Sequence, residues 1–513
     1  MTIAGLGPES RIDMHIFAAI DVGSNAIRMS VARRDGDGKL EILDNTRVAV
    51  RLGSDAFALG EISDSTMEAA TDAFLRFRGI ADDFAVTGAR AVATSALREA
   101  RNSDELIERI ALRSQWSVEV IGGEEEARLI QLAVARAVDL KGKRSMLVDI
   151  GGGSAEVTLC DGEDIICTES YDLGAVRLLK QFGDAAHGSP AFHVLVGERT
   201  EAVRRRIVQE IGDGPVELCV GTGGNLEELG ELRKRLYKHD SARLLTVGEL
   251  EGLIDTLVGM TVPERIVRFQ LRPDRADVIV PAAVVMLGIA RIAGVAEIHL
   301  PGVGLKDGIL WDLASQAAPR PPRREQVWSS ALRLAARYEA DDEHGAVVCE
   351  LACQLFDQSG VLHGLGGDER LLLEVSGLLH DVGHFINARD HDRHGHYILR
   401  NSYIFGLTRR QQAIVAGAVR YHRKSMPSPD HEHFRALPVA DRQLVRQLSA
   451  LLRLADGIDS GHVSRVRRVT LAEAGGSWRL VLHGEDDLTF EKWNLAKRRT
   501  LFQEVFGVDL QIA

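Results

Sequence analysis

Two short glycine-rich stretches carry the residue types that bind a phosphate group. The first is DVGSN, residues 21–25, and the second is DIGGGSAE, residues 149–156. In each, small residues follow an aspartate, and their backbone N–H groups and short polar side chains can surround a phosphate without steric conflict. The residues that we expect to bind phosphate are Ser24, Asn25, Gly151, Gly152, Gly153 and Ser154.

Two carboxylates, Asp149 and Glu156, flank the second stretch. A phosphate would be repelled by both unless a cation lay between them. Mg²⁺ suits this position because it shares its coordination shell between carboxylates, water and phosphate oxygens. We therefore expect Asp149 and Glu156 to bind Mg²⁺, with Mn²⁺ as the alternative ion; the competing interpretation is an acidic hairpin at the surface.

Further charged residues stand beside glycine or loop signals. Glu124, Glu125 and Glu126 follow a Gly-Gly turn and begin a helical pattern, where acidic residues also serve simply as helix caps. A carboxylate held near a phosphate can instead orient or deprotonate an attacking water. Arg98, at a loop-to-helix junction, either neutralises a phosphate or is a solvated helix residue. Spacing alone leaves both choices open.

The elements that would position these residues repeat along the chain. Strand-like runs surround each glycine turn, and residues 20–31 and 148–159 share an aspartate, a glycine, a small residue and a closing apolar run. A third glycine turn, at 220–229, joins a strand to a helix. We expect an α/β fold of two similar lobes that face a shared cleft, with boundaries at 1–140 and 141–317.

The pattern changes after the proline- and arginine-rich stretch 318–326, which is typical of an extended linker. Residues 327 to about 460 have helical periodicity, and the last fifty residues alternate as strands do before a final helix. We therefore predict an all-α domain at 318–462 and a small α+β subdomain at 463–513.

Composition limits the possible partners. The net charge of −12 and the pI of about 5.8 argue against a general nucleic-acid or membrane-surface binder. The most apolar window, 278–290, is too short to span a bilayer and is expected to be a buried helix with Pro281 in its first turn. With no signal peptide in view and five cysteines without a CxxC pair, we expect a cytoplasmic protein.

A series of ordered motifs resembles a known family. The blocks that carry the resemblance are DVGSN, ATSALREARN, VIGGEEEARL, VDIGGGSAEV, DLGAVRL, GTGGN, RPDRADVIVPA and GVGLKDGILWDL. Their order is similar to that of the exopolyphosphatase and guanosine pentaphosphate phosphatase family, within the actin-like ATPase clan. The resemblance implies paired ribonuclease-H-like lobes and commonly a homodimer. It also implies Glu125 as the carboxylate that activates water, Glu156 as a second essential acid and Arg98 as a phosphate ligand.

The helical part carries the order H…HD…D at His344, His380–Asp381 and Asp456, which resembles the HD phosphohydrolase superfamily. Imidazoles and carboxylates from several helices can form a metal site. The resemblance implies a second divalent metal in an HD-like domain. Whether this site is catalytic, binds a metal without turnover or is an inherited scaffold stays open.

The leading hypothesis is an exopolyphosphatase that releases orthophosphate from linear polyphosphate. The alternatives are a phosphatase acting on guanosine penta- or tetraphosphate and a phosphotransferase from polyphosphate to a nucleoside diphosphate. A sensor that binds nucleotide or polyphosphate without turnover is the alternative from another class.

Overall fold

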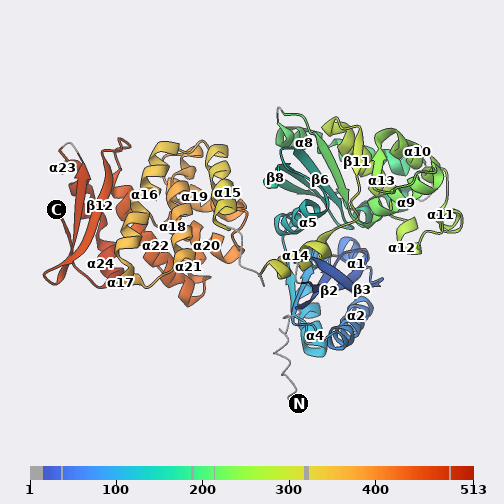
Figure 1. Cartoon of the computed structure of the whole chain (residues 1–513), viewed down its shortest axis with the longest axis horizontal. Helices are drawn as coiled ribbons and strands as arrows, with labels where there is room; N and C mark the ends of the chain where they lie inside the picture. Colours follow the sequence, from blue (N-terminus) through green and yellow to red (C-terminus); the bar gives the residue numbers. More distant parts are fainter. Residues whose placement is uncertain (1–14, 36–37, 187–189, 213, 317–322, 485–486) are drawn as a thin grey trace, which may run out of the picture. The chain divides into compact units, whose positions relative to one another are not determined.

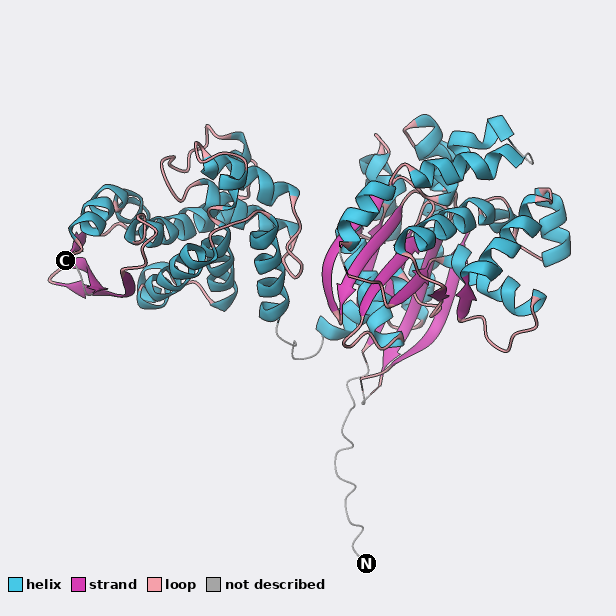
Figure 2. Ribbon diagram, turned by 90° about the horizontal axis from the view of Figure 1, so that it is seen from above, coloured by secondary structure: helices cyan, strands magenta, loops and turns pink. Residues whose placement is uncertain are grey.

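The computed structural model describes residues 15–316 and 323–513, except 36–37, 187–189, 213 and 485–486. The chain forms two compact units, Met1–Arg320 and Pro321–Ala513. The first, here called the α/β unit, has a hydrophobic core in each of its two lobes, and the second, the helical unit, has one core of its own. Figure 2 shows strands between helices in the α/β unit.

The first lobe contains a five-stranded sheet in the order β3-β2-β1-β4-β5. β1, β2 and β3 form an antiparallel meander, and β4 and β5 continue from β1 in parallel. Its strands are β1 Ile16–Val22, β2 Ile27–Arg34, β3 Leu40–Val48, β4 Gly88–Ala93 and β5 Val118–Val120. Its helices are α1 Leu52–Leu59, α2 Asp64–Asp83, α3 Ser95–Glu99, α4 Ser103–Ser114 and α5 Gly123–Ala137.

The second lobe has a six-stranded sheet in the order β10-β11-β9-β6-β7-β8. Its strands are β6 Arg144–Ile150, β7 Ala155–Asp161, β8 Asp164–Tyr171, β9 Leu218–Thr222, β10 Leu244–Thr246 and β11 Glu297–His299. Its helices are α6 Ala175–Ala186, α7 Pro190–Glu201, α8 Arg204–Ile211, α9 Gly224–Leu236, α10 Val247–Val258, α11 Val262–Phe269, α12 Pro273–Ala276 and α13 Ile279–Ala293.

The two lobes share one topology. Antiparallel β6, β7 and β8 correspond to β1, β2 and β3, and β9 and β11 continue in parallel as β4 and β5 do. The glycine stretches of the sequence form the turns at equivalent places, between β1 and β2 and between β6 and β7. The predicted pair of similar α/β lobes is confirmed.

The boundary expected for the second lobe is wrong at its end. Helix α14, Leu305–Gln316, lies within the range expected for the second lobe, but it packs against α5, β1 and β2 of the first lobe. Figure 1 shows α14 beside the blue strands of that lobe. An amphipathic pattern shows that a helix has an apolar face, not which sheet covers it, so only the tertiary fold reveals this return.

The apolar window is a core helix. Among the described residues, Pro273–Ala293 is long and apolar enough to cross a membrane, and 67% of its window is buried inside the fold. Pro281 lies in the first turn of α13, as expected. The helix ends where Gly294 adopts a φ of 70°, which lets its N–H cap the last turn.

The first helix of the helical unit begins inside the stretch 318–326, which the sequence predicts to be a linker. Part of 318–326 lies outside the described residues, but from Arg323 onward the chain is helix α15, Arg323–Arg337. The other helices are α16 Asp342–Gln358, α17 Gly360–His363, α18 Gly367–Leu379, the 3₁₀ helix η1 Val382–Phe385, α19 His391–Asn401, α20 Arg409–Arg420, α21 Glu432–Arg435, α22 Val439–Ile458, α23 Thr489–Arg498 and α24 Thr500–Phe506.

A small sheet completes the helical unit. It consists of β12 Val466–Ala474, β13 Ser477–Gly484 and β14 Leu510–Ile512, with β12 and β13 joined through Gly475 and Gly476 at positive φ. The expected α+β elements are therefore present. They share one hydrophobic core with the helices, because β12 packs against α16 and α22 packs against α23 and α24.

Candidate active site

A cavity of about 400 Å³ lies in the α/β unit where residues of both lobes meet. Its wall includes the β1–β2 turn, the β6–β7 turn and the start of α9. The lining residues from these turns are Gly23, Ser24, Asn25, Gly151, Gly152, Ser154, Gly223, Gly224 and Asn225. The three glycine turns singled out in the sequence thus converge on one cavity.

The glycines of the β6–β7 turn allow this convergence. A Cβ at Gly152 would lie 2.8 Å from the Cβ of Ser24, so any side chain there would push the two loops apart. Gly153 does not line the cavity; a Cβ there would overlap Ser95 and Phe57. The turn of the second lobe is therefore in direct contact with the first lobe.

Three carboxylates gather beside this cavity, and we call Glu126, Asp149 and Glu156 the carboxylate cluster; Glu126 and Asp149 line the cavity, whereas the buried Glu156 is not among its lining residues. Asp149 and Glu156 are opposite residues of β6 and β7, so their side chains share a face of the sheet. Glu126 joins them from the first turn of α5, and one oxygen of each residue lies within 4.8 Å of the others.

Burial changes the acidity of the carboxylate cluster. It raises the pKa of Asp149 to about 6 and, together with the charge of Asp149, that of Glu156 to about 7. Burial and the two other carboxylates raise the pKa of Glu126 well above its ordinary value. The buried Oε2 atoms of Glu126 and Glu156 have no hydrogen-bond partner among the described residues. Oxygen atoms grouped in this way suit a hard divalent cation such as Mg²⁺.

Neighbouring polar groups orient the cluster from outside. The hydroxyl of Thr222 donates to Asp149 Oδ1 at 2.5 Å, and that of Ser170 donates to Glu156 Oε1 at 2.8 Å. Each carboxylate keeps its second oxygen away from these donors. The residues present therefore fit a bound cation, held by the remaining oxygens.

Glu125, expected to activate water, does not line the cavity. Its carboxylate accepts hydrogen bonds at 2.8 and 2.9 Å from Arg128 and at 3.1 Å from Arg90. These partners hold it on another face of α5, and they lower its pKa even though burial alone would raise it. The neighbouring Glu126 occupies the place foreseen for Glu125.

Two predicted phosphate ligands have other partners. Arg98 donates to the carbonyl of Ile121 at 2.6 Å and lies 3.7 Å from Glu126 Oε2, and it does not line the cavity. It fastens the turn before α5. Asn25 does line the cavity, but its Nδ2 donates to the carbonyl of Asp274 at 2.8 Å, leaving Oδ1 without a partner among the described residues.

Sequence reasoning missed the cations of the cavity. Five line it, namely Arg28, Arg47, Arg272, Arg275 and Lys306. Burial, and then the charges of Arg28 and Arg272, lower the pKa of Arg275 to about 10. Arg272, Arg275 and Lys306 belong to motifs RPDRAD and GVGLKDG, so the signal was present in the sequence but was not assigned.

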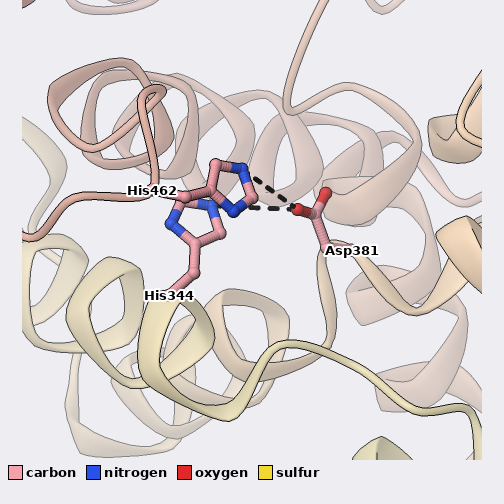
Figure 3. Close-up of side chains that lie close together, drawn as sticks. All are labelled: His344, Asp381 and His462. Carbon is pink, nitrogen blue, oxygen red and sulfur yellow. Dashed lines mark ion pairs between the residues drawn. The ribbon is translucent and has the colours of Figure 1, made fainter.

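The residues of the predicted second metal site also come together, within the helical unit. His344 Nε2 lies 3.8 Å from Asp381 Oδ2 and 3.9 Å from Asp456 Oδ1. His380 Nε2 lies 3.6 and 4.0 Å from the same two oxygens. His462, missed in the sequence, stacks on His344 and lies 3.9 Å from Asp381 Oδ2 (Figure 3).

Comparisons with known proteins agree with this architecture. Residues 30–317 match the Ppx/GppA phosphatase family, and residues 328–497 match Ppx/GppA phosphatase, domain III. Guanosine-5'-triphosphate,3'-diphosphate pyrophosphatases of Vibrio parahaemolyticus and Photobacterium profundum are 27% identical over 448 residues and 26% identical over 441 residues. In both cases the match covers 86% of this chain and 86% of the relative.

Solved structures give the same result. An exopolyphosphatase from Cytophaga hutchinsonii has a TM-score of 0.56 and 27% identity, over 59% of this chain and 98% of its own. A Ppx/GppA family member of Aquifex aeolicus has a TM-score of 0.52 and 28% identity, over 60% of this chain and 99% of its own. With one family match spanning more than half of its length, the chain belongs to the Ppx/GppA phosphatase family.

Proposed function

We propose that the α/β unit hydrolyses the terminal phosphoric anhydride of linear inorganic polyphosphate and releases orthophosphate. The observation that supports this most is the composition of one cavity: three glycine turns, five cations, and Glu126 and Asp149 of the carboxylate cluster. Phosphoryl transfer depends mainly on positioning and on charge neutralisation, and these groups supply both.

In this proposal the cations bind the anionic chain, and the glycine turns position its terminal phosphate. The oxygen of a water attacks the terminal phosphorus, the anhydride P–O bond breaks, and the shortened chain leaves with the bonding electrons. Glu126, a carboxylate that lines the cavity, accepts the proton of that water.

A divalent cation belongs to the proposal. Asp149 and Glu156 would hold Mg²⁺, or Mn²⁺, which when bound neutralises charge on the phosphate oxygens. Glu126 and Glu156 each offer a buried oxygen that accepts no hydrogen bond from the described residues, although Arg98 lies 3.7 Å from that of Glu126. The positive charge of the bound cation would reduce the electrostatic repulsion between the three carboxylates.

Hydrolysis of a guanosine pentaphosphate is the second candidate, favoured by the names of the curated relatives. The cavity would accept the same terminal phosphate. However, the apolar residues among the described lining are only Ala26, Ile150, Val176 and Leu305, with no aromatic side chain. A guanine base is usually bound by stacking or in an apolar slot, so we place polyphosphate first.

The test compares two adjacent glutamates. Orthophosphate release from polyphosphate and from guanosine pentaphosphate is measured for the wild type, Glu126→Gln and Glu125→Gln. Glu126→Gln should reduce kcat about 10² to 10⁴-fold, because it removes the proton acceptor. Glu125→Gln, whose partners lie outside the cavity, should keep at least about a tenth of the activity. Loss of activity in Glu125→Gln but not in Glu126→Gln would overturn the assignment.

A further inference from the structure

The motif DLGAVRL, residues 172–178, leads into the start of α6 and contributes only Val176 to the described lining of the cavity. Its backbone lies against the β6–β7 turn. A Cβ at Gly174 would lie 2.1 Å from the carbonyl carbon of Gly153 and 2.3 Å from the nitrogen of Ser154. Any other residue at this position would therefore displace the turn.

The first N–H groups of α6 bind carbonyl oxygens of the turn. The N–H of Ala175 donates to the carbonyl of Gly151 at 3.0 Å. Those of Val176 and Arg177 donate to the carbonyl of Gly152 at 2.8 and 3.0 Å. The first N–H groups of a helix have no acceptor within the helix, and here the turn supplies the acceptors. Two carbonyls of the turn are thereby directed towards α6.

The side chain of Arg177 binds the third carbonyl of the turn. Its Nε donates to the carbonyl of Gly153 at 2.6 Å, and its Nη2 forms an ion pair with Glu99 of α3 in the first lobe. Its Cζ lies 4.3 Å from the centre of the ring of Phe57, which belongs to α1 of the same lobe. A planar guanidinium can bind both polar partners while its face lies on an aromatic ring. One side chain of the second lobe thus connects the turn to the first lobe.

The directions of these carbonyls determine the directions of three N–H groups. In a trans peptide the C=O and the N–H of the next residue point in opposite directions, and no described peptide bond is cis. The N–H groups of Gly152, Gly153 and Ser154 therefore point away from α6 and Arg177. Among the described residues these three groups form no hydrogen bond, and Gly152 and Ser154 line the cavity. Successive N–H groups of this kind can bind an anion.

We propose that Arg177 is a positioning residue for the terminal phosphate: it holds the carbonyl of Gly153 and so orients the N–H groups of the turn towards the phosphate. The inference rests on the proposed function for the identity of that phosphate. The glycines at 151–153 leave the peptides of the turn free to rotate once this contact is lost. A rotated peptide would present a carbonyl oxygen, which repels a phosphate, in place of an N–H that binds it.

Orthophosphate binding by the full chain tests the inference without hydrolysis. Its Kd is measured in Mg²⁺ by isothermal titration calorimetry for the wild type, Arg177→Ala and Arg177→Lys. The Kd should rise about tenfold in Arg177→Ala and at least about threefold in Arg177→Lys, which keeps the charge but lacks the planar fork. Arg205→Ala, an exposed arginine of α8 outside the described lining, is the control and should leave the Kd unchanged.

Equal Kd values for the wild type and Arg177→Ala would overturn the inference, as would the absence of orthophosphate binding by the wild type. Full affinity in Arg177→Lys would also overturn it, because charge alone would then be sufficient. Glu99→Gln weakens the same contact from the first lobe and leaves Arg177 in place. It should raise the Kd about two- to threefold, and an unchanged Kd would overturn the part played by the first lobe.

Hydrolysis of polyphosphate distinguishes a positioning role from a structural one. Arg177→Ala should lower kcat about 10- to 100-fold, because a misplaced phosphate reacts slowly, and change KM less than about threefold, because the cations of the cavity still bind the chain. Guanidinium at a non-denaturing concentration should occupy the vacated space and restore kcat at least about fivefold in Arg177→Ala, but not in Glu126→Gln.

Loss of activity in Arg177→Ala without rescue by guanidinium, accompanied by a lower Tm, would mean that the arginine is structural and would overturn the inference. A different result would contradict the proposed function alone. In that case the wild type would release no orthophosphate from polyphosphate, while its binding of orthophosphate would still depend on Arg177.

Discussion

The carboxylate cluster has a counterpart in the helical unit, here called the histidine cluster, which consists of His344, His380, Asp381, His391, His422 and Asp456. Both clusters bring buried carboxylates together, but they differ in the other groups present. The carboxylate cluster offers oxygen atoms alone, from Glu126, Asp149 and Glu156. The histidine cluster adds imidazole nitrogens to two carboxylates, and its outer hydrogen bonds fix the rings. Oxygen-only sites favour Mg²⁺, whereas nitrogen ligands favour transition metals. The comparison predicts that the two clusters would favour different ions.

The pKa values of the carboxylates also differ between the two clusters. In the carboxylate cluster, burial and like charges raise the pKa of Asp149 and Glu156. In the histidine cluster, burial alone would raise the pKa of Asp381, but the imidazoles of His380, His422 and His391 lower it. Burial would likewise raise the pKa of Asp456, and Arg498 lowers it. The first group therefore depends on an external cation more than the second does.

The largest expected effect separates the two clusters by metal. Full-length protein is stripped with a chelator and refilled with Mg²⁺ alone. Mg²⁺ should restore orthophosphate release from polyphosphate at least about 100-fold over the metal-free protein, because oxygen ligands accept it. It should not fill the histidine cluster, whose nitrogen ligands favour a transition metal. Mn²⁺ added afterwards should therefore bind there, as counted by elemental analysis.

Orthophosphate release and Mn²⁺ content are measured on the same sample, and circular dichroism shows whether the chain has refolded. Failure of the Mg²⁺-loaded protein to take up Mn²⁺ would remove the distinction between the clusters.

A smaller effect concerns the cations that only the α/β cavity possesses. Arg272 lines this cavity and is exposed, so Arg272→Gln should leave the fold intact. We expect KM for polyphosphate to rise about three- to tenfold at low salt with little change in kcat, and the difference to shrink as salt screens the charge. Arg268→Gln is the control, an exposed arginine of the same unit outside the described lining. An equal rise in KM for both variants would indicate a general charge effect.

The sequence predicted the lobes but not every residue of the cleft. Period-two strands and glycine turns are local signals, and the second copy of the pattern at 148–159 supported the first. Which glutamate of α5 faces the cavity is a matter of helical rotation, since adjacent residues point about 100° apart. A signal was available: Arg128 stands three residues after Glu125 and pairs with it, which leaves Glu126 for the cavity.

The other features that the sequence did not predict depend on packing between distant segments of the chain. The return of α14 to the first lobe and the grouping of Arg47 with Arg275 join segments that are far apart in sequence. In the helical unit, the order H…HD…D pointed to His344, His380, Asp381 and Asp456. His391 and His422 are 31 residues apart in the sequence and come together only in the folded unit. Neither relation has a local pattern to reveal it.

The smallest expected effect uses a carboxylate of the α/β unit that has partners of its own. Burial alone would raise the pKa of Glu249, but hydrogen bonds from Arg233, the Thr246 cap and His239 lower it to about 2. Because the folded-state pKa lies below the ordinary value of 4.5, the ionised side chain stabilises the fold fully above about pH 4.5. That contribution is lost as the pH falls towards 2.

Glu249→Gln should therefore lower the free energy of unfolding at pH 7 by about 1 kcal/mol, after allowance for solvent screening. The difference from the wild type should narrow between about pH 4.5 and pH 2, as measured by denaturant titration. Glu251→Gln, on the same helix and paired at the surface with Arg291, should change stability by less than about 0.5 kcal/mol. A difference that is independent of pH would mean that packing, rather than charge, stabilises Glu249. It would also weaken the contrast with the carboxylate cluster, where Arg98 lies 3.7 Å from Glu126 and burial nevertheless raises the pKa of that residue.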